Sequence, residues 1–173
     1  MTYLDAQYDL HDGRPAVTFE RAYRVPVSEV WQVMASPQGL AAWFPSPEVS
    51  YQPRVGGQIT LGGDPHQESL TGTVIAYTEE QEFGFDWGSD QLYLSVEPDP
   101  DGARFRLVNI LRNAEGAARN AAGWDVCLDQ FELALTGTSA DAQNDGTLEE
   151  FTPVLAAYVA KGFPDDGWLP EDD

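Results

Sequence analysis

Hydrophobic and polar residues alternate with a period of two over two parts of the chain, which predicts strands there. The first part, residues 16–25 (AVTFERAYRV), places Phe19 and Arg21 on one side of a strand that Pro26 ends. Residues 1–15 lack this alternation and are mostly polar. We expect them to form a loose lead-in before the first strand.

Between residues 26 and 47 the spacing of the apolar residues changes to one that is typical of helices, and it predicts two short ones. Ser28 is a typical N-cap residue for the first helix. Ser36, which a proline follows, restarts the chain as the second helix. This helix ends near Phe44, because the proline at position 45 cannot continue it.

Two large aromatic residues, Trp43 and Phe44, are adjacent at the end of this second helix. Neighbouring residues of a helix point about 100° apart, so only one of the two can face the nearest element. The other can line a ligand cavity or contact a partner. Alternatively, both seal the end of a sheet, and the sequence alone leaves these interpretations open.

The alternation with a period of two returns after residue 47 and lasts to residue 111. Short turns rich in glycine and polar residues divide this part into about six segments. Their order in hairpins predicts an antiparallel meander. The predicted strands are 48–55, 57–61, 70–78, 82–87, 91–98 and 103–111.

Helical spacing reappears in two segments near the C-terminus. Residues 117–135 form the longest predicted helix, about 30 Å long. Its inner stripe consists of Ala121, Trp124, Leu128, Phe131 and Leu135, with Val126 and Cys127 beside it. Residues 148–161 form a last amphipathic helix with a stripe of Leu148, Phe151, Leu155, Tyr158 and Val159.

The last helix must bury its stripe against another surface, because an isolated helix of about 14 residues is marginal in water. We expect it to dock on its own domain, with docking on a second copy as the alternative, so the protein is a monomer or a homodimer. The predicted organisation is a domain over residues 16–136, preceded by the lead-in. Residues 137–173 add an acidic linker, the extra helix and a loose tail.

The order of one strand, two short helices, six strands and a long helix is that of the helix-grip fold. Five stretches in sequence also resemble the heat-shock-protein-90 ATPase activator homology family, which lies within the SRPBCC, or START-like, superfamily. These stretches are VPVSEVWQVMASPQGLAAWF, VGGQITL, LTGTVIAYTEEQEFGFDW, ARFRLVNIL and GWDVCLDQFELAL. The resemblance covers about residues 16–136.

The resemblance implies an α+β fold in which a curved antiparallel sheet wraps around the long C-terminal helix. In this fold the space between sheet and helix is commonly an apolar cavity. Asn109 departs from the family's commoner pattern, in which a histidine often lies near this position. An amide cannot act as a base at neutral pH, so no catalytic role is carried over to Asn109.

The charge of the chain narrows the classes of partner. The 173 residues include 29 acidic and 9 basic ones, which gives a net charge of −20. Such a charge repels nucleic acid and anionic membrane surfaces, so we expect neither as a partner. It favours solubility, with an acidic docking surface for a basic partner as the alternative.

The sequence also lacks the signals that would place the protein in or across a membrane. No apolar run reaches the roughly 20 residues that span a bilayer. The N-terminus does not have the basic start and apolar core of a signal peptide. We therefore expect a cytoplasmic location.

Residues that could support catalysis or bind a metal are few. His11 and His66 are the only histidines, and neither has a partner at metal-ligand spacing. Cys127, the single cysteine, lies on the inner side of the long helix, where a buried and unreactive thiol is expected. We predict no cofactor and no metal.

Candidate binding residues are the large side chains on inward-facing positions, and we predict that they line a cavity between sheet and long helix. They are Trp43, Phe44, Phe83, Phe85, Trp87, Leu107, Asn109, Trp124, Leu128 and Phe131. Asn109 would be a lone amide there, and backbone, water or a ligand can satisfy it. Arg21 can bind an anionic group or form a surface salt bridge.

Three functions are compatible with these features. The preferred one is non-enzymatic binding of a small hydrophobic molecule by a carrier or sensor. The second is interaction with a chaperone, as the name of the resembled family implies. The third is an enzyme of the cyclase or aromatase type, which needs acid–base groups in the pocket, and the only polar side chains to name there are Asn109, Arg21 and Tyr23.

Overall fold

The computed structural model describes residues 4–64, 68–136 and 148–167. Within these ranges, eight strands form one antiparallel sheet in the order β1-β2-β8-β7-β6-β5-β4-β3. The strands are β1 (Gln7–His11), β2 (Arg14–Tyr23), β3 (Glu48–Tyr51), β4 (Gln58–Gly62), β5 (Leu70–Thr78), β6 (Glu82–Trp87), β7 (Asp90–Asp99) and β8 (Gly102–Ile110). The α+β class and the helix-grip fold are confirmed.

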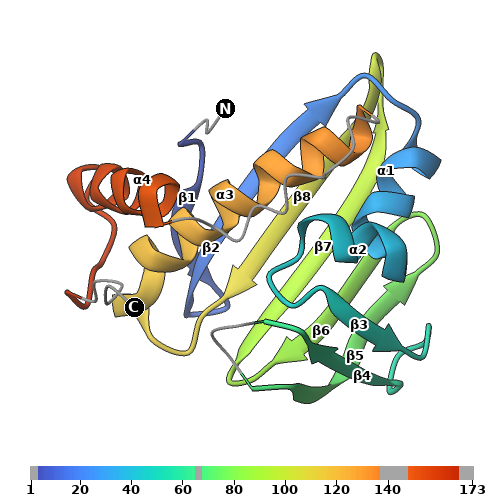
Figure 1. The fold of residues 1–173 in the computed structure, drawn as a ribbon, viewed down its shortest axis with the longest axis horizontal. Coiled ribbons are helices and arrows are strands. Elements are labelled where there is room, and N and C mark those ends of the chain that lie inside the picture. Colours follow the sequence, from blue (N-terminus) through green and yellow to red (C-terminus); the bar gives the residue numbers. More distant parts are fainter. Residues whose placement is uncertain (1–3, 65–67, 137–147, 168–173) are drawn as a thin grey trace.

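Four helices and one short 3-10 segment accompany the sheet in the described ranges. The long helix α3 (Ala117–Leu135) crosses the concave face of the sheet, after the 3-10 turn η1 (Ala114–Gly116) (Figure 1). Helices α1 (Val27–Ala35) and α2 (Pro37–Trp43) lie at one end of the sheet, and α4 (Leu148–Ala160) packs beside α3. No described helix is both long and apolar enough to cross a membrane.

The N-terminal segment differs from the sequence-based expectation. The loose lead-in is wrong for residues 7–11, which form β1 and pair along their whole length with β2. Asp12 and Gly13 both have positive φ, 51° and 80°, which is the backbone of a type I′ hairpin turn. β1 was missed because it lies at the sheet edge, where backbone pairing rather than apolar side chains holds the strand.

The two short helices begin and end almost as predicted, but their caps differ. Ser28 is not the N-cap of α1, because that place is taken by Pro26, whose side chain makes no capping bond. Ser36 caps α2, and its side-chain oxygen accepts a hydrogen bond from the backbone N–H of Gly39. A side chain at Gly39 would collide with the backbone of α1, so the glycine permits the tight angle between the helices.

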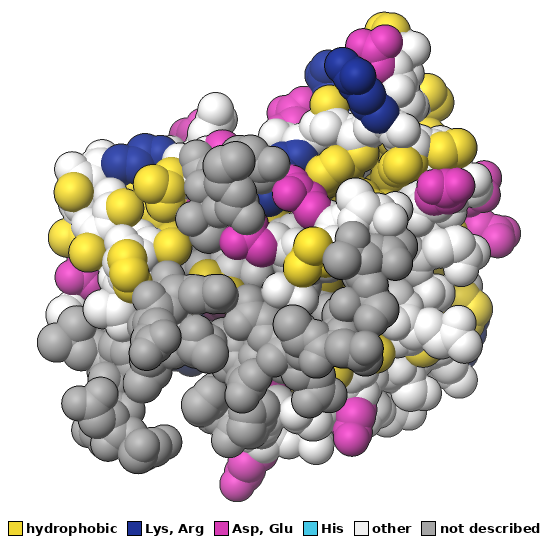
Figure 2. Space-filling view, turned by 45° about the horizontal axis from the view of Figure 1, so that its top comes forward, with side chains coloured by type: hydrophobic (Ala, Val, Ile, Leu, Met, Phe, Trp, Pro, Cys, Tyr) yellow, Lys and Arg dark blue, Asp and Glu magenta, His cyan; other side chains and the backbone are white. Residues whose placement is uncertain are grey.

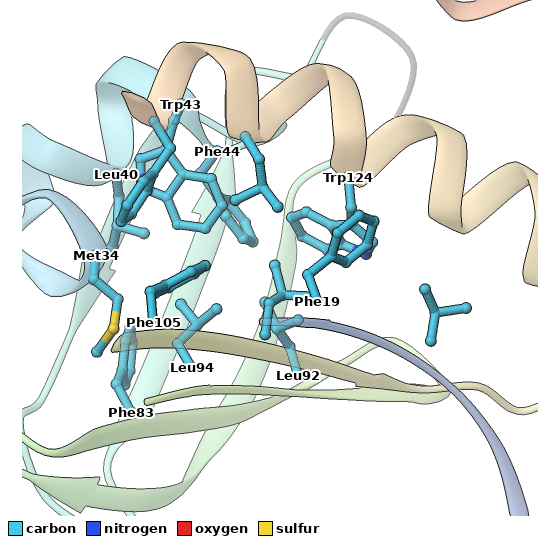
Figure 3. Packing of buried hydrophobic residues seen from close by; sticks show 14 of the residues in the cluster. Phe19, Met34, Leu40, Trp43, Phe44, Phe83, Leu92, Leu94, Phe105 and Trp124 are labelled. Atoms are coloured by element: carbon cyan, nitrogen blue, oxygen red, sulfur yellow. The ribbon is translucent and has the colours of Figure 1, made fainter. Parts of the chain in front are cut away.

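The core lies between the concave face and α3. Phe83 and Phe85 of β6 and Phe105 and Leu107 of β8 point inward with no exposed surface, as their alternation predicts. From the other side, α2 and α3 direct Trp43, Phe44 and Trp124 towards the sheet (Figure 3).

Helix α4 docks on its own chain. Val154, Leu155 and Tyr158 are buried, whereas Val159 is 40% exposed, so its place in the predicted apolar stripe is wrong. The side chain of Leu148 and the predicted linker 137–147 lie outside the described residues.

The segment that follows α4 is also held against α3, in contrast to the loose tail predicted from the sequence. The carbonyl of Pro164 accepts a hydrogen bond from the N–H of Ala118 at 3.0 Å. Arg119 pairs with Asp166 at 3.3 Å. The C-terminal segment is therefore fixed up to residue 166, while residues 168–173 lie outside the described ranges.

Candidate functional site

Trp43 and Phe44 both point into the core, which answers the question raised by their adjacency. Their rings meet edge to face, 5.5 Å apart, and each is less than 5% exposed. The indole N–H of Trp43 donates to the carbonyl of Val33 at 2.8 Å, and its ring lies 5.1 Å from that of Phe131. Trp43 thus joins α2 to both α1 and α3.

Phe44 lies at the centre of a second group of aromatic rings. Its ring centre lies 6.0 Å from Phe85, 5.4 Å from Trp87 and 5.6 Å from Trp124. Trp87 and Trp124 are also in contact with each other, at 5.4 Å. We call Phe44, Phe85, Trp87 and Trp124 the aromatic cluster, which joins α2, β6 and α3.

The residues predicted to line a cavity come together, but they are packed against one another. Side chains without exposed surface cannot border a space that a water molecule enters, and the residues in this state are Phe83, Phe85, Leu107, Asn109, Leu128 and Phe131. Trp43, Phe44 and Trp124 are at most 4% exposed. Trp87 is the one predicted lining residue that is partly exposed.

Trp87 also differs from its neighbours in hydrogen bonding. The N–H of Trp124 donates to the side-chain oxygen of Asn109 at 3.0 Å, and that of Trp43 is satisfied as described. The indole nitrogen of Trp87 is buried, yet it has no hydrogen-bond partner among the residues that the structure describes. An unpaired buried donor costs about 1–3 kcal/mol.

Asn109 is held by the protein itself. Its oxygen accepts from Trp124, and its amide nitrogen donates to the carbonyl of Gln91 at 3.2 Å. Of the partners left open by the sequence, the backbone binds the amide nitrogen, whereas the side chain of Trp124, which was not among them, binds the oxygen. The amide fixes Trp124 above the sheet, so Asn109 positions one ring of the aromatic cluster.

A buried ionic network lies on the other side of α3, and sequence analysis missed most of it. Arg21 of β2 is not in a surface salt bridge, because it is 7% exposed and bonded to Asp5 at 2.8 and 3.1 Å. It also donates to Asp125 of α3 at 2.8 Å, and Glu132 lies 3.6 Å away. Arg21 thus ties the N-terminal segment to α3.

Tyr158 connects α4 to the same network. Its hydroxyl donates to Asp125 and accepts from the backbone N–H of Ala6 at 3.1 Å. Burial, together with the bond to Asp125, raises the pKa of Tyr158. Burial also raises the pKa of Asp125, although the bonds from Tyr158 and Arg21 oppose this.

The residue Cys127 keeps some exposed surface, but its thiol group is desolvated by burial, as the sequence predicts. Desolvation raises the pKa of this thiol to about 12, and the charges of Asp64 and Asp129 add to the effect. The thiol is therefore protonated near neutral pH and a poor nucleophile.

No group of three or more metal-ligating side chains occurs within the described ranges. His11 is exposed at the sheet edge, whereas His66 lies outside the described residues.

Comparison with known proteins agrees with this architecture. Residues 24–136 match the model of a family described as activator of Hsp90 ATPase homolog 1-like protein. The chain belongs to this family. A search among curated proteins gives no match.

Solved structures resemble the chain at low sequence identity. CalU16 from Micromonospora echinospora is 18% identical in its crystal structure, over 85% of this chain and 87% of that chain, with a TM-score of 0.67. EF2215 from Enterococcus faecalis, a conserved protein of unknown function, is 19% identical over 92% and 91%, with a TM-score of 0.72. The AHSA1-like protein from Aeromonas hydrophila is 17% identical over 71% and 93%, with a TM-score of 0.61. At these identities the likeness shows the fold alone.

The family match covers about two thirds of the chain and leaves out β1, β2 and α4. The structural match to the Enterococcus protein covers 92% of this chain, so it must include parts of these outer segments.

Proposed function

We propose that the protein binds one small, mostly apolar molecule between the sheet and α3, in the place that the Trp87 indole occupies in the unliganded chain. The observation that carries the proposal is the state of Trp87. Its ring is partly exposed at the end of the aromatic cluster, and its buried N–H has no partner among the described residues.

The energetics favour Trp87 as the side chain that turns outward to make room for a ligand. Its contacts with Phe44 and Trp124 are each worth about 0.5–1.5 kcal/mol beyond area burial. An outward turn loses these contacts but lets the N–H bond to water, which recovers about 1–3 kcal/mol. These two terms roughly cancel, so the main cost of opening is the apolar ring surface that becomes exposed, and a ligand in the vacated place offsets it by burying its own surface.

The space released by Trp87 has a defined chemistry. Its walls are the rings of Phe44, Phe85 and Trp124, and Asn109 holds Trp124 in place. Walls of this kind favour a flat, uncharged aromatic or polycyclic ligand, which stacks on rings at offset or edge-to-face angles.

Fluorescence titration with Prodan, a neutral naphthalene fluorophore with a carbonyl group, tests the proposal. We expect saturable one-to-one binding, about tenfold tighter to Trp87→Ala, because the variant no longer spends about 1.4 kcal/mol on opening the cluster. Trp31→Ala is the matched control, since Trp31 is equally large but contacts Tyr77, which faces Phe83 at the other end of β6. Absence of saturable binding to both the native chain and Trp87→Ala contradicts the proposal.

The other two functions have less support from the site. The chaperone-associated function rests on the description of the family alone. Among the polar side chains named for an enzyme, Arg21 and Asn109 are engaged in fixed contacts. We therefore place binding first.

A further inference from the structure

An open hollow of about 530 Å³ lies beside β3, away from the aromatic cluster. One side of it comes from α2, which lies beside β3 in Figure 1, and the other from β3, β4 and Ser69 just before β5. β3 is the last strand of the sheet, so no described strand covers its outer edge. The residues that border the hollow and matter below are Pro37, Ala41, Glu48, Val49, Ser50 and Gly62.

The pairing of β3 with β4 shows which backbone groups point to this edge. The N–H of Gln52 donates to the carbonyl of Gln58, and Ser50 lies opposite Thr60 in the same register. In an antiparallel pair, hydrogen-bonded positions alternate with positions whose backbone groups face the other way. Val49 and Tyr51 therefore direct their N–H and C=O groups to the open edge.

This edge is held rigidly by the side chains on its inner face. Val49 is 7% exposed. The hydroxyl of Tyr51 donates to the carbonyl of Ala35 at 2.6 Å, and its ring stacks on Phe83 at 4.4 Å. The outward backbone groups of Val49 and Tyr51 are thus presented in a fixed geometry, which lowers the entropy cost of pairing with another strand.

A carboxylate lies at the same edge. Glu48 is exposed and forms no ion pair with any residue in the described ranges. Its side chain lies over Gly62 and Gly63, and a Cβ at Gly63 would come within 2.9 Å of it. The glycines thus make room for an acidic side chain at the rim of the hollow.

We propose that an extended, basic segment of a partner protein adds to the sheet as a strand beside β3. Main-chain hydrogen bonds to Val49 and Tyr51 give the affinity, as in other cases of strand addition. Glu48 and the net charge of −20 select a segment with lysine or arginine. A second copy of this chain is the less favourable occupant, because both copies carry the same excess of negative charge.

Prolines limit the length of the added strand. Pro47 precedes β3 and Pro53 follows it, and proline interrupts a hydrogen-bonded ladder. The four residues of β3 therefore pair with a short linear segment rather than with a long strand. Such a short, charged edge also resists uncontrolled self-association.

Amide hydrogen exchange followed by NMR tests the inference. The probe is a capped hexapeptide of alternating lysine and valine, and the matched control peptide alternates glutamate and valine. We expect the lysine peptide to slow exchange at the Val49 and Tyr51 amides about tenfold or more, because each forms a new hydrogen bond. The amides of Ser50 and Gln52, already bonded to β4, should change little.

Variants that remove one charge separate the electrostatic contribution to peptide binding from the contribution of the main-chain hydrogen bonds. Glu48→Gln should weaken binding of the lysine peptide about 3–5-fold and reduce its salt dependence. Glu29→Gln, an exposed acid on α1, is the matched control and should leave binding unchanged.

Unchanged exchange at Val49 and Tyr51 with saturating lysine peptide would overturn the inference. If the glutamate peptide bound equally well, the inference that the partner segment is basic would be wrong. Protection of these two amides that rises with protein concentration, without peptide, would show a second copy of the chain in its place. None of these outcomes depends on ligand binding at Trp87.

Discussion

Asp125 shows how one buried carboxylate can join three parts of a chain. It has no exposed surface, and it accepts hydrogen bonds from Arg21 and Tyr158. Through these two partners it connects α3 with β2 and α4. Because a buried charge is costly unless it is paired, each partner matters more than its own bond.

Replacement of Tyr158 by phenylalanine tests this network. The variant leaves Asp125 with one partner fewer and the N–H of Ala6 unpaired. We expect the free energy of unfolding, measured by urea denaturation, to fall by about 1–3 kcal/mol. Tyr8→Phe is the control, since that ring also packs on the C-terminal segment through Phe163. Equal stability of the two variants would show that the network contributes little.

The raised pKa of Tyr51 leads to a prediction about the stability of the protein at alkaline pH. Burial, with the nearby Tyr77, raises its pKa from 10.0 to about 12. A raised folded-state pKa contributes stability below the unfolded value, and this stability is lost as the pH rises towards the folded value. The free energy of unfolding should therefore fall between pH 10 and 12. This slope should be shallower in Tyr51→Phe, and an identical slope would contradict the assignment.

Sequence patterns predicted which residues face inward but not what they bond to. Asn109 was placed inside by the alternation of β8, but its partner Trp124 lies on another element. Asp125 was missed because a single acid beside Trp124 and Val126 looks like a solvated helix position. Its partner Arg21 is 104 positions away in sequence, so only the folded structure shows the pair.

Helices and strands whose apolar residues recur at a regular spacing were predicted well. The long helix has the predicted ends, residues 117 and 135, because its apolar stripe repeats for five turns. β1 was missed, and the strand predicted at residues 48–55 ends at Tyr51. Both errors lie at sheet edges, where a polar sequence or a proline leaves little side-chain pattern to detect.

Removal of residues 137–173 tests the role of α4 as a docked element. The truncation exposes the apolar surface beneath Val154 and Leu155 and leaves Asp125 without Tyr158. We expect the melting temperature to fall by roughly 5 °C or more and light scattering to show aggregation. Removal of residues 168–173 alone is the control, and we expect the longer truncation to lower the melting temperature more. A truncated chain that remains monomeric and equally stable would contradict docking.

The whole molecule carries far more acid than base. Acidic side chains reach the upper and lower parts of the face in Figure 2, whereas basic ones gather towards its upper part. A net charge of −20 repels itself across the surface, and this repulsion opposes the compact state.

Salt should therefore stabilise the protein. Sodium chloride at about 0.5 M shortens the screening length to roughly 4 Å, which weakens surface repulsion more than the buried Arg21 network. We expect the melting temperature to rise by roughly 2–5 °C. A fall in melting temperature would show that surface ion pairs outweigh the repulsion.

The central claim is that Trp87 gives way to a ligand, and the indole N–H signals of the five tryptophans test it directly. In an NMR titration with Prodan, the Nε1–H signal of Trp87 should move to the position of a hydrogen-bonded indole, with smaller shifts for Trp124. The signal of Trp31 should stay in place, because its ring lies against Tyr77, outside the aromatic cluster. Equal small shifts of all five signals, or none at saturating Prodan, would contradict binding at this site.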